Sequence, residues 1–242
     1  MAPTATLPRR FDKLAGFVAF TRLARVVEVQ DDLVGEFRSL AQAAGLRGAD
    51  IVIDERAKSG DKPILVIDVK SEPLLFNVTS ENVLFRVSEG HEPDVLPPYL
   101  RCLLQAVVST VKPGAPIGFE VQGRRILAID GAKNYQVMQS LLPGLAMGEH
   151  LFASLPSSHY QVQRTDVTVA ITVGSYDYIY VIEAPANDNW STLWFTFVVR
   201  SSDSDHLGRL VPEHIAELAN QVFTGDPLMQ ALCRNVTVRL RG

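Results

Sequence analysis

Two aspartates and a lysine occupy positions that a β-hairpin would bring together. Asp50 precedes the apolar residues 51–53, while Asp68 and Lys70 alternate with apolar residues in the run 63–70. If the loop is centred on residues 58–60, the numbers of two residues that lie opposite each other add up to about 118. Asp50 then lies opposite Asp68. Lys70 points to the same face, because side chains alternate along a strand. Two carboxylates this close repel each other unless a cation or a shared proton intervenes.

Such a cluster suits metal-assisted hydrolysis. Asp50 and Asp68 could ligate Mg²⁺, and Lys70 could orient water or stabilise developing charge at a phosphodiester. Glu36, on a predicted helix before the hairpin, is a further candidate acid. The alternative interpretation needs no cofactor: the three residues form a solvated sheet face on which Lys70 relieves the repulsion between the acids.

The residues "ADIVI…PILVIDVKSE" resemble the PD-(D/E)xK nuclease superfamily. Asp50 matches the first acid, and Asp68 and Lys70 match the second acid and the lysine. The resemblance implies a metal-dependent nuclease with nucleic acid as its partner. The chain departs from the pattern where Ala49 replaces a proline, where a hairpin follows the lysine, and where Pro185 stands at the lysine position of the second half. No strand is predicted between the helix and Asp50.

Two arginines and two tryptophans are candidate binding residues. Arg124 and Arg125 follow Gly123, at the predicted tip of a hairpin around residues 122–123, where they could contact a phosphate or an acidic partner. An exposed turn is the simpler interpretation. Trp194 should point away from its apolar strand neighbours, and Trp190 precedes the same strand. An exposed tryptophan can anchor a partner, whereas a covering helix would make it core.

Other catalytic signatures do not occur in the sequence. There is no HExxH, no G-x-S-x-G elbow, no GxGxxG and no Walker motif. Zinc hydrolysis, serine hydrolysis and nucleotide binding therefore have no motif to support them.

A stripe of tyrosines runs through "DVTVAITVGSYDYIYVIEAP". Gly174-Ser175 suits a two-residue hairpin turn. Such a turn fixes the register, so that the numbers of two opposed residues add up to about 349. Tyr176, Tyr178 and Tyr180 then share a face with the valines and isoleucine of the preceding strand. That face is apolar, so we expect the tyrosines to belong to the core.

The elements that must position these residues follow one order twice: helix, antiparallel meander, helix, strand. The first set comprises helices over 33–45 and 99–111 with strands over 50–55, 63–70, 73–78 and 82–87; the second comprises helices over 134–147 and 212–223 with strands over 167–173, 176–183, 192–199 and 236–240. The sequence therefore predicts an α+β fold by tandem duplication of this unit. A leader ending in a strand at 25–29 fills residues 1–30, the first repeat 31–130 and the second 131–242. Chance similarity between two ordinary hairpins is the alternative.

Composition limits the protein class. The 242 residues are 47% hydrophobic and 21% charged, as in globular proteins, and the net charge of −4 disfavours a broad nucleic-acid-binding field. Cys102 and Cys233 form no CxxC pair or disulfide framework. Without an apolar leader at the N-terminus or a run of about 18 apolar residues, we expect a cytoplasmic protein with no membrane partner. The sequence leaves the oligomeric state open.

The order of elements is also similar to that of the YbjN and type III secretion chaperone group. The matching elements are "LVGEFRSLAQAAG", the strands within 51–87, "YLRCLLQAVVSTV" and "GFEVQGRRILAID". The resemblance is one of architecture, and it implies a bacterial protein that binds other proteins without catalysis. We therefore expect a non-enzymatic, protein-binding adaptor or chaperone-like module, with the metal-dependent nuclease as the alternative.

Overall fold

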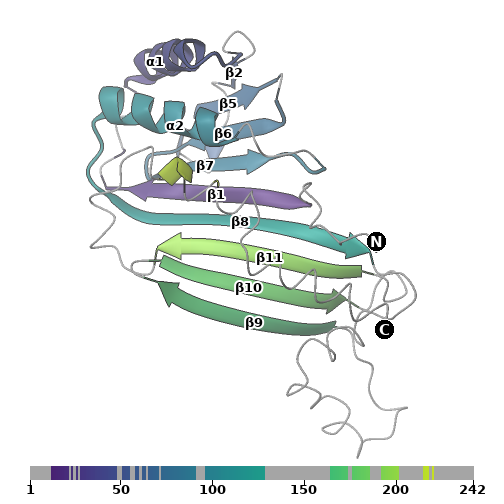
Figure 1. Cartoon of the computed structure of the whole chain (residues 1–242). Helices are drawn as coiled ribbons and strands as arrows, with labels where there is room; N and C mark the ends of the chain where they lie inside the picture. Colours follow the sequence, from purple (N-terminus) through teal and green to yellow (C-terminus); the bar gives the residue numbers. More distant parts are fainter. Residues whose placement is uncertain are drawn as a thin grey trace, which may run out of the picture.

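The computed structural model describes residues 12–21, 23, 26, 28–47, 51–54, 58–59, 62–63, 65–70, 72–90, 96–128, 164–173, 176–185, 192–201, 215–217 and 220. Nine of its strands form one antiparallel sheet in the order β2-β5-β6-β7-β1-β8-β11-β10-β9 (Figure 1). They are β1 (Lys13–Phe20), β2 (Ile51–Asp54), β5 (Leu65–Val69), β6 (Leu74–Val78), β7 (Asn82–Val87), β8 (Pro116–Ala128), β9 (Arg164–Val173), β10 (Tyr176–Pro185) and β11 (Thr192–Ser201). Strands β3 (Lys58–Ser59) and β4 (Lys62–Pro63) form a separate pair.

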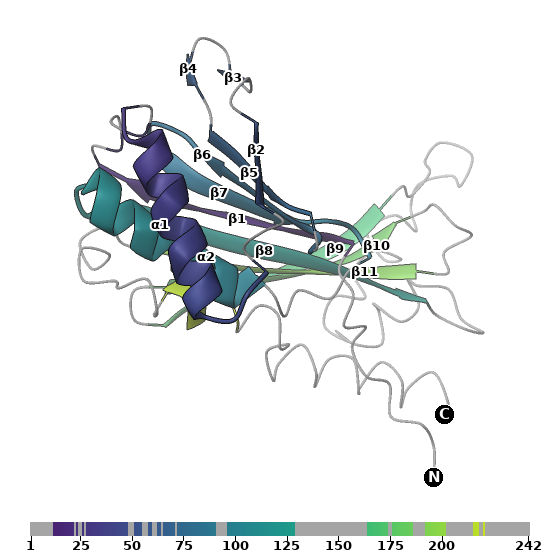
Figure 2. The same ribbon diagram turned by 90° about the horizontal axis from the view of Figure 1, so that it is seen from above.

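Two helices cover one face of this sheet. They are α1 (Gln30–Ala43) and α2 (Leu96–Ala106), the latter continuing into a π-helical turn, η2 (Val107–Val111). Phe37 of α1 packs edge-on against Phe76 of β6, with ring centroids 6.3 Å apart. We name this face the helix side and the opposite face the open side. Figure 2 shows α1 and α2 together on the helix side.

The predicted helix over 33–45 is confirmed together with its end signals. Asp31 and Asp32 lie in the first turn of α1, where carboxylates favour the free backbone N–H groups. Gly45 follows the helix with a φ of 72°, a left-handed conformation that glycine adopts at little cost. The side chains that α1 buries recur at helical spacing: Leu33, Val34, Phe37 and Ala41.

The strand predicted at residues 25–29 is wrong. Residues 26, 28 and 29 lie in turns before α1, and the strand of this region is β1, at Lys13–Phe20. β1 lies in the middle of the sheet, paired with β7 on one side and β8 on the other. Valine-rich residues 26–29 have strand propensity, but pairing with two neighbours decided where the strand forms.

The hairpin predicted around residues 122–123 is also wrong. β8 runs without a turn from Pro116 to Ala128, and Gly123 continues it opposite Leu14 of β1 and Phe197 of β11. Glycine inside a strand marks a close approach as readily as it marks a turn. Arg124 and Arg125 consequently point to opposite faces of the sheet.

Both halves of the chain share this sheet. β8 pairs along nine residues with β11, and one core cluster contains buried residues from both sides of residue 130, such as Phe76 and Phe195. The antiparallel α+β fold is confirmed. The described meanders differ in size, with four strands (β2, β5, β6, β7) against three (β9, β10, β11), so the tandem duplication is not confirmed. The helix predicted at 134–147 and the strand at 236–240 lie outside the described residues.

No helix in the described part of the chain combines the length and the apolar character that a membrane span requires.

Candidate functional site

The tyrosine stripe has the predicted register. Tyr176 pairs with Val173, Tyr178 with Ile171 and Tyr180 with Val169. Tyr180 is 5% exposed, and its ring stacks on that of Phe197 with centroids 4.8 Å apart. Tyr176 and Tyr178 are half-buried against the core. The stripe is therefore core where it adjoins β11.

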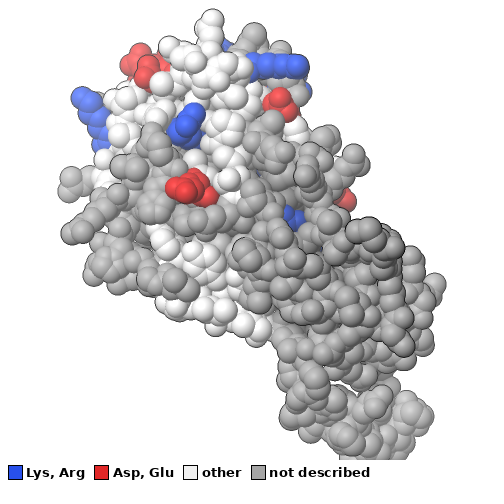
Figure 3. Space-filling view, viewed as in Figure 1, with Lys and Arg blue, Asp and Glu red and all other residues white. Residues whose placement is uncertain are grey.

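Towards β9 the same face becomes surface. Val169 and Ile171 are 43% and 41% exposed. On the helix side, shown in Figure 3, the described atoms over part of β9–β11 form an area without charged side chains. The sheet therefore ends in an apolar margin on this side.

The predicted opposition of Asp50 and Asp68 is wrong. In the β2–β5 pair Asp68 lies opposite Val52, and Ile51 lies opposite Val69. The register differs from the prediction by two residues, and the short β3–β4 pair, in which Ser59 lies opposite Lys62, also has a later centre than predicted. An even shift keeps each residue on its predicted face but changes its neighbour. Asp50 itself lies outside the described residues.

The structure separates the remaining acid candidates. Asp68 is half-buried on the open side, and the exposed Lys70 follows it at the end of β5. Glu36 belongs to α1, which packs on the helix side against Phe76, the neighbour of Ile67. The sheet therefore lies between Glu36 and Asp68. Among the described residues, no three His, Cys, Asp or Glu side chains are grouped so that they could hold a metal ion.

The two arginines have different environments. Arg125 points to the helix side opposite Phe195 and is 2% exposed, so it belongs to the core rather than to an exposed turn. Arg124 points to the open side and forms a salt bridge with Asp12. One position along β8 thus separates a buried arginine from one whose side chain is 31% exposed.

Arg124 and Trp194 form a pair on the open side. The guanidinium carbon of Arg124 lies 4.6 Å from the centroid of the Trp194 ring, a cation–π contact between β8 and β11. The pair follows from the register, since Arg124 lies opposite Thr196, two positions from Trp194. In the described residues the buried indole Nε1 of Trp194 has no hydrogen-bond acceptor. A buried donor of this kind calls for an explanation, such as an ordered water or a functional role. Trp190 lies outside the described residues.

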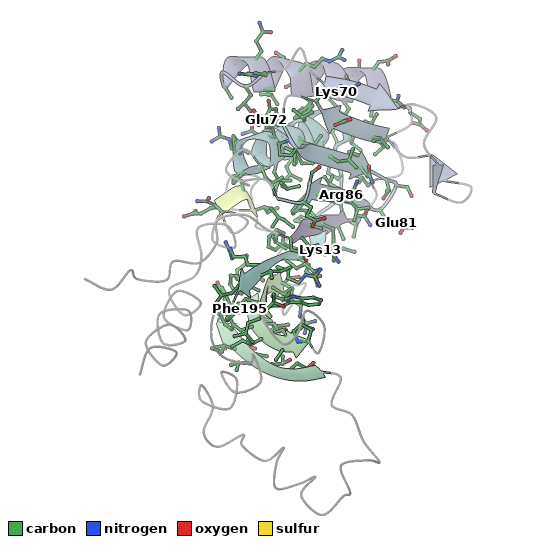
Figure 4. The ribbon with its side chains drawn as sticks, turned by 90° about the vertical axis from the view of Figure 1, so that its right-hand side faces the viewer. Lys13, Lys70, Glu72, Glu81, Arg86 and Phe195 are labelled. Carbon is green, nitrogen blue, oxygen red and sulfur yellow. The ribbon has the colours of Figure 1, made fainter. Side chains whose placement is uncertain are left out.

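Further cations extend this pair into a row across the sheet. Lys13 of β1 lies directly opposite Arg124, and Arg86 of β7 lies opposite Ala15, diagonal to Lys13. Lys13, Arg86 and Lys70 are all exposed. Figure 4 shows Lys70, Arg86 and Lys13 one after another down the sheet. We name Lys70, Arg86, Lys13, Arg124 and Trp194 the cationic row.

The row could not be recognised as one site from the sequence. Four of its members lie on β7, β1, β8 and β11, and Lys70 directly follows β5, so only the pairing order brings them together. One signal was present for two of the cations: Lys70 and Arg86 each follow an apolar residue, as in "VLFRV" for Arg86.

Two ionisable groups lie in environments that favour their neutral forms. Burial raises the pKa of the Cys102 thiol on α2, against smaller lowering effects of Arg101 and a backbone hydrogen bond. Burial also raises the pKa of Tyr176, with a further increase from Tyr178. A thiol with a raised pKa is a poor nucleophile, so Cys102 has no environment suited to catalysis.

No protein-family model matches this chain, and a search of curated proteins finds no match.

Proposed function

We propose that the protein acts without catalysis, as an adaptor or chaperone-like module that binds another protein through the open side of its sheet. The observation that carries this proposal is the Arg124–Trp194 contact within the cationic row, on a face that no described helix covers. Tryptophan and arginine are the residues that most often supply binding energy at protein interfaces.

The row indicates the chemistry of the partner. It extends from β5 to β11, five strand spacings of about 4.8 Å each, or about 24 Å in all. About seven residues of extended chain have this length. An acidic segment with an aromatic or apolar residue at one end would meet Lys70, Arg86 and Lys13 with its carboxylates and Trp194 with its apolar residue. The row is a local feature, because the net charge of the chain is −4 and Asp68, Glu120 and Glu183 also lie on the open side.

The architecture agrees with this function. Meanders β2–β5–β6–β7 and β9–β10–β11 flank the central pair β1–β8, and their shared antiparallel order supports a degenerate tandem duplication of the helix–meander–helix–strand unit. The proposed resemblance to the YbjN and type III secretion chaperone group also rests on this unit. Analogy between folds supports a function less strongly than a site does, so the cationic row remains the principal ground.

The test compares two charge reversals. The partner recovered with the wild-type protein from its host would be identified, and its binding measured by calorimetry at low and high salt. Arg86→Glu and Trp194→Ala should each weaken binding at least tenfold. Arg101→Glu makes the same charge change at an exposed position on α2 and should bind as the wild type does. Equal binding by all four proteins would refute the use of the open side. Turnover of a small substrate without any specific partner would refute the adaptor function.

A metal-dependent nuclease is the second candidate, because the exposed Lys70 follows Asp68 by two positions, directly after β5. Wild type and Lys70→Ala would be incubated with DNA and RNA in the presence of Mg²⁺ or Mn²⁺. Cleavage that requires the metal and disappears in the variant would establish the nuclease. The separation of Glu36 from Asp68 leads us to expect no cleavage by either protein.

A further inference from the structure

The two edge strands of the sheet differ in how well they are protected against pairing with a further strand. β2, at one edge, has four residues and leads into the short β3–β4 hairpin. β9, at the other edge, has ten residues, and within the described residues it pairs only with β10. Natural sheets usually protect an edge by short strands, prolines or charges, because unpaired backbone groups can accept another strand. Residues 167–173 of β9 contain none of these protective residues.

Both faces of β9 are accessible as well. Residues 168–172 are exposed at every position, so neither side of the strand is covered. The pair that flanks a two-residue hairpin loop exchanges both of its backbone hydrogen bonds, and here that pair is Val173 and Tyr176. The odd-numbered residues of β9 therefore bond to β10. The even-numbered residues, Asp166, Thr168, Ala170 and Thr172, point their backbone N–H and C=O groups outward.

We propose that β9 pairs antiparallel with β9 of a second copy of this chain, joining two sheets into one across a two-fold axis at Ala170. The inference is independent of the cationic row and of the proposed function. About six backbone hydrogen bonds would connect the copies, from Thr168, Ala170 and Thr172 on each. A two-fold axis perpendicular to the sheet makes the interface self-complementary, since the same strand supplies both halves.

Side-chain chemistry selects a second copy as the occupant. With the axis at Ala170, Val169 lies opposite Ile171 on the helix side, which joins the two apolar margins. On the open side Thr168 lies opposite Thr172, a favourable cross-strand pair. The two Asp166 carboxylates are then eight positions apart along the strand direction, or about 27 Å. An unrelated strand would have to match this apolar and uncharged pattern, whereas β9 matches itself.

One hydrogen bond argues against an axis one residue earlier, at Val169. The Thr172 hydroxyl donates to Asp177 Oδ1 at 2.8 Å. An axis at Val169 would place Asp166 of one copy opposite Thr172 of the other, and so beside Asp177. Two carboxylates would then approach each other in the interface. The axis at Ala170 avoids this repulsion.

The test uses a charge swap at the axis. Ala170 is exposed, so Ala170→Lys and Ala170→Glu should leave the monomer folded, as circular dichroism and thermal melting can confirm. Light scattering after size exclusion should give a dimer for the wild type at tens of micromolar and monomers for each variant alone. Mixing the two variants should restore the dimer, because opposite charges then face each other at the axis. The control Ala170→Thr, with an uncharged strand-forming residue, should remain dimeric.

Several results would overturn the inference. A wild type that is monomeric at several hundred micromolar would exclude a second copy as the occupant of β9. Capture of a different protein that is lost in Ala170→Pro, which removes an outward N–H, would assign the edge to another partner instead. A dimer that survives both charged variants would place the interface elsewhere on the molecule.

Discussion

Gly16 is the position at which the structure makes its sharpest stability prediction. It lies in the middle of β1, opposite Phe85 of β7 and Val121 of β8. A Cβ at this position would lie 2.5 Å from Phe85 Cζ and would also collide with the backbone carbonyl oxygen of Glu120. The phenylalanine ring could rotate away, but the carbonyl belongs to a strand held by pairing on both sides. Gly16→Ala must therefore move part of the sheet.

We expect Gly16→Ala to lower the free energy of unfolding by about 3 kcal/mol, the upper end of the usual cost of overpacking. For a chain of this size, that corresponds to a fall in Tm of about 6–12 °C. Gly35→Ala is the matched control, since a Cβ there meets nothing within 4 Å. Gly35 is exposed inside α1, so alanine should raise stability by about 0.5–1 kcal/mol.

Urea unfolding followed by two probes would test both the magnitude and the unity of the sheet. Both tryptophans of the chain, at 190 and 194, lie in the second half, whereas Gly16 lies near the N-terminus. If β1 and β8 join the halves into one cooperative unit, tryptophan fluorescence and circular dichroism should shift together in Gly16→Ala. A change below about 0.5 kcal/mol would refute the packing argument. A fluorescence transition that stays unchanged would refute the single cooperative sheet.

Three further predictions follow from the described contacts. Tyr180→Ala, which removes a 5%-exposed ring stacked on Phe197, should cost about 3 kcal/mol in urea unfolding, and Tyr178→Ala, at a half-buried position, less than half of that. Burial raises the pKa of Cys102 and of Tyr176, so the unfolded chain loses these protons first, and stability should fall as pH rises above about 9. Tyr176→Phe should reduce that slope, and a flat profile to pH 11 would contradict the burial. Asp68→Asn should change stability by less than about 0.5 kcal/mol with or without Mg²⁺, because Asp68 faces Val52 rather than a second acid; Mg²⁺-dependent stabilisation of the wild type alone would contradict this.

Local patterns predicted much of the fold. The helix at 30–43 has apolar spacing and end signals that do not depend on the rest of the chain, and the β9–β10 register follows from a two-residue turn. The errors arose where a distant strand decides the outcome. Gly123 resembles a turn residue until β1 and β11 are known to pair on either side of it. The loop before β5 is long enough for more than one centre, so the neighbour of Asp68 could not be derived from spacing alone.

The candidate site was likewise predictable only in part: single residues could be identified from the sequence, but their contacts depend on distant strands. Trp194 and Arg124 were identified individually, but their contact depends on the β8–β11 pairing, which joins residues about 70 positions apart. Lys13 and Arg86 were missed because lone cations in strands are common and their alignment requires the strand order. Arg125 was placed with Arg124 because adjacent residues in a turn can act together. In a continuous strand adjacent residues cannot do so, since their side chains leave from opposite faces.

The two proposed surfaces have a joint consequence. A two-fold axis perpendicular to the sheet keeps the open sides of both copies on the same face of the joined sheet. Trp194 of each copy lies on β11, two strands from β9, so the two cationic rows would be five strand spacings apart across the sheet, or about 24 Å. A partner with two acidic segments could then engage both rows at once, and its second contact would form at a high effective concentration. Weak binding at each row would become strong binding by the dimer. The β9 edge would thus set the affinity of a site to which it contributes no residue.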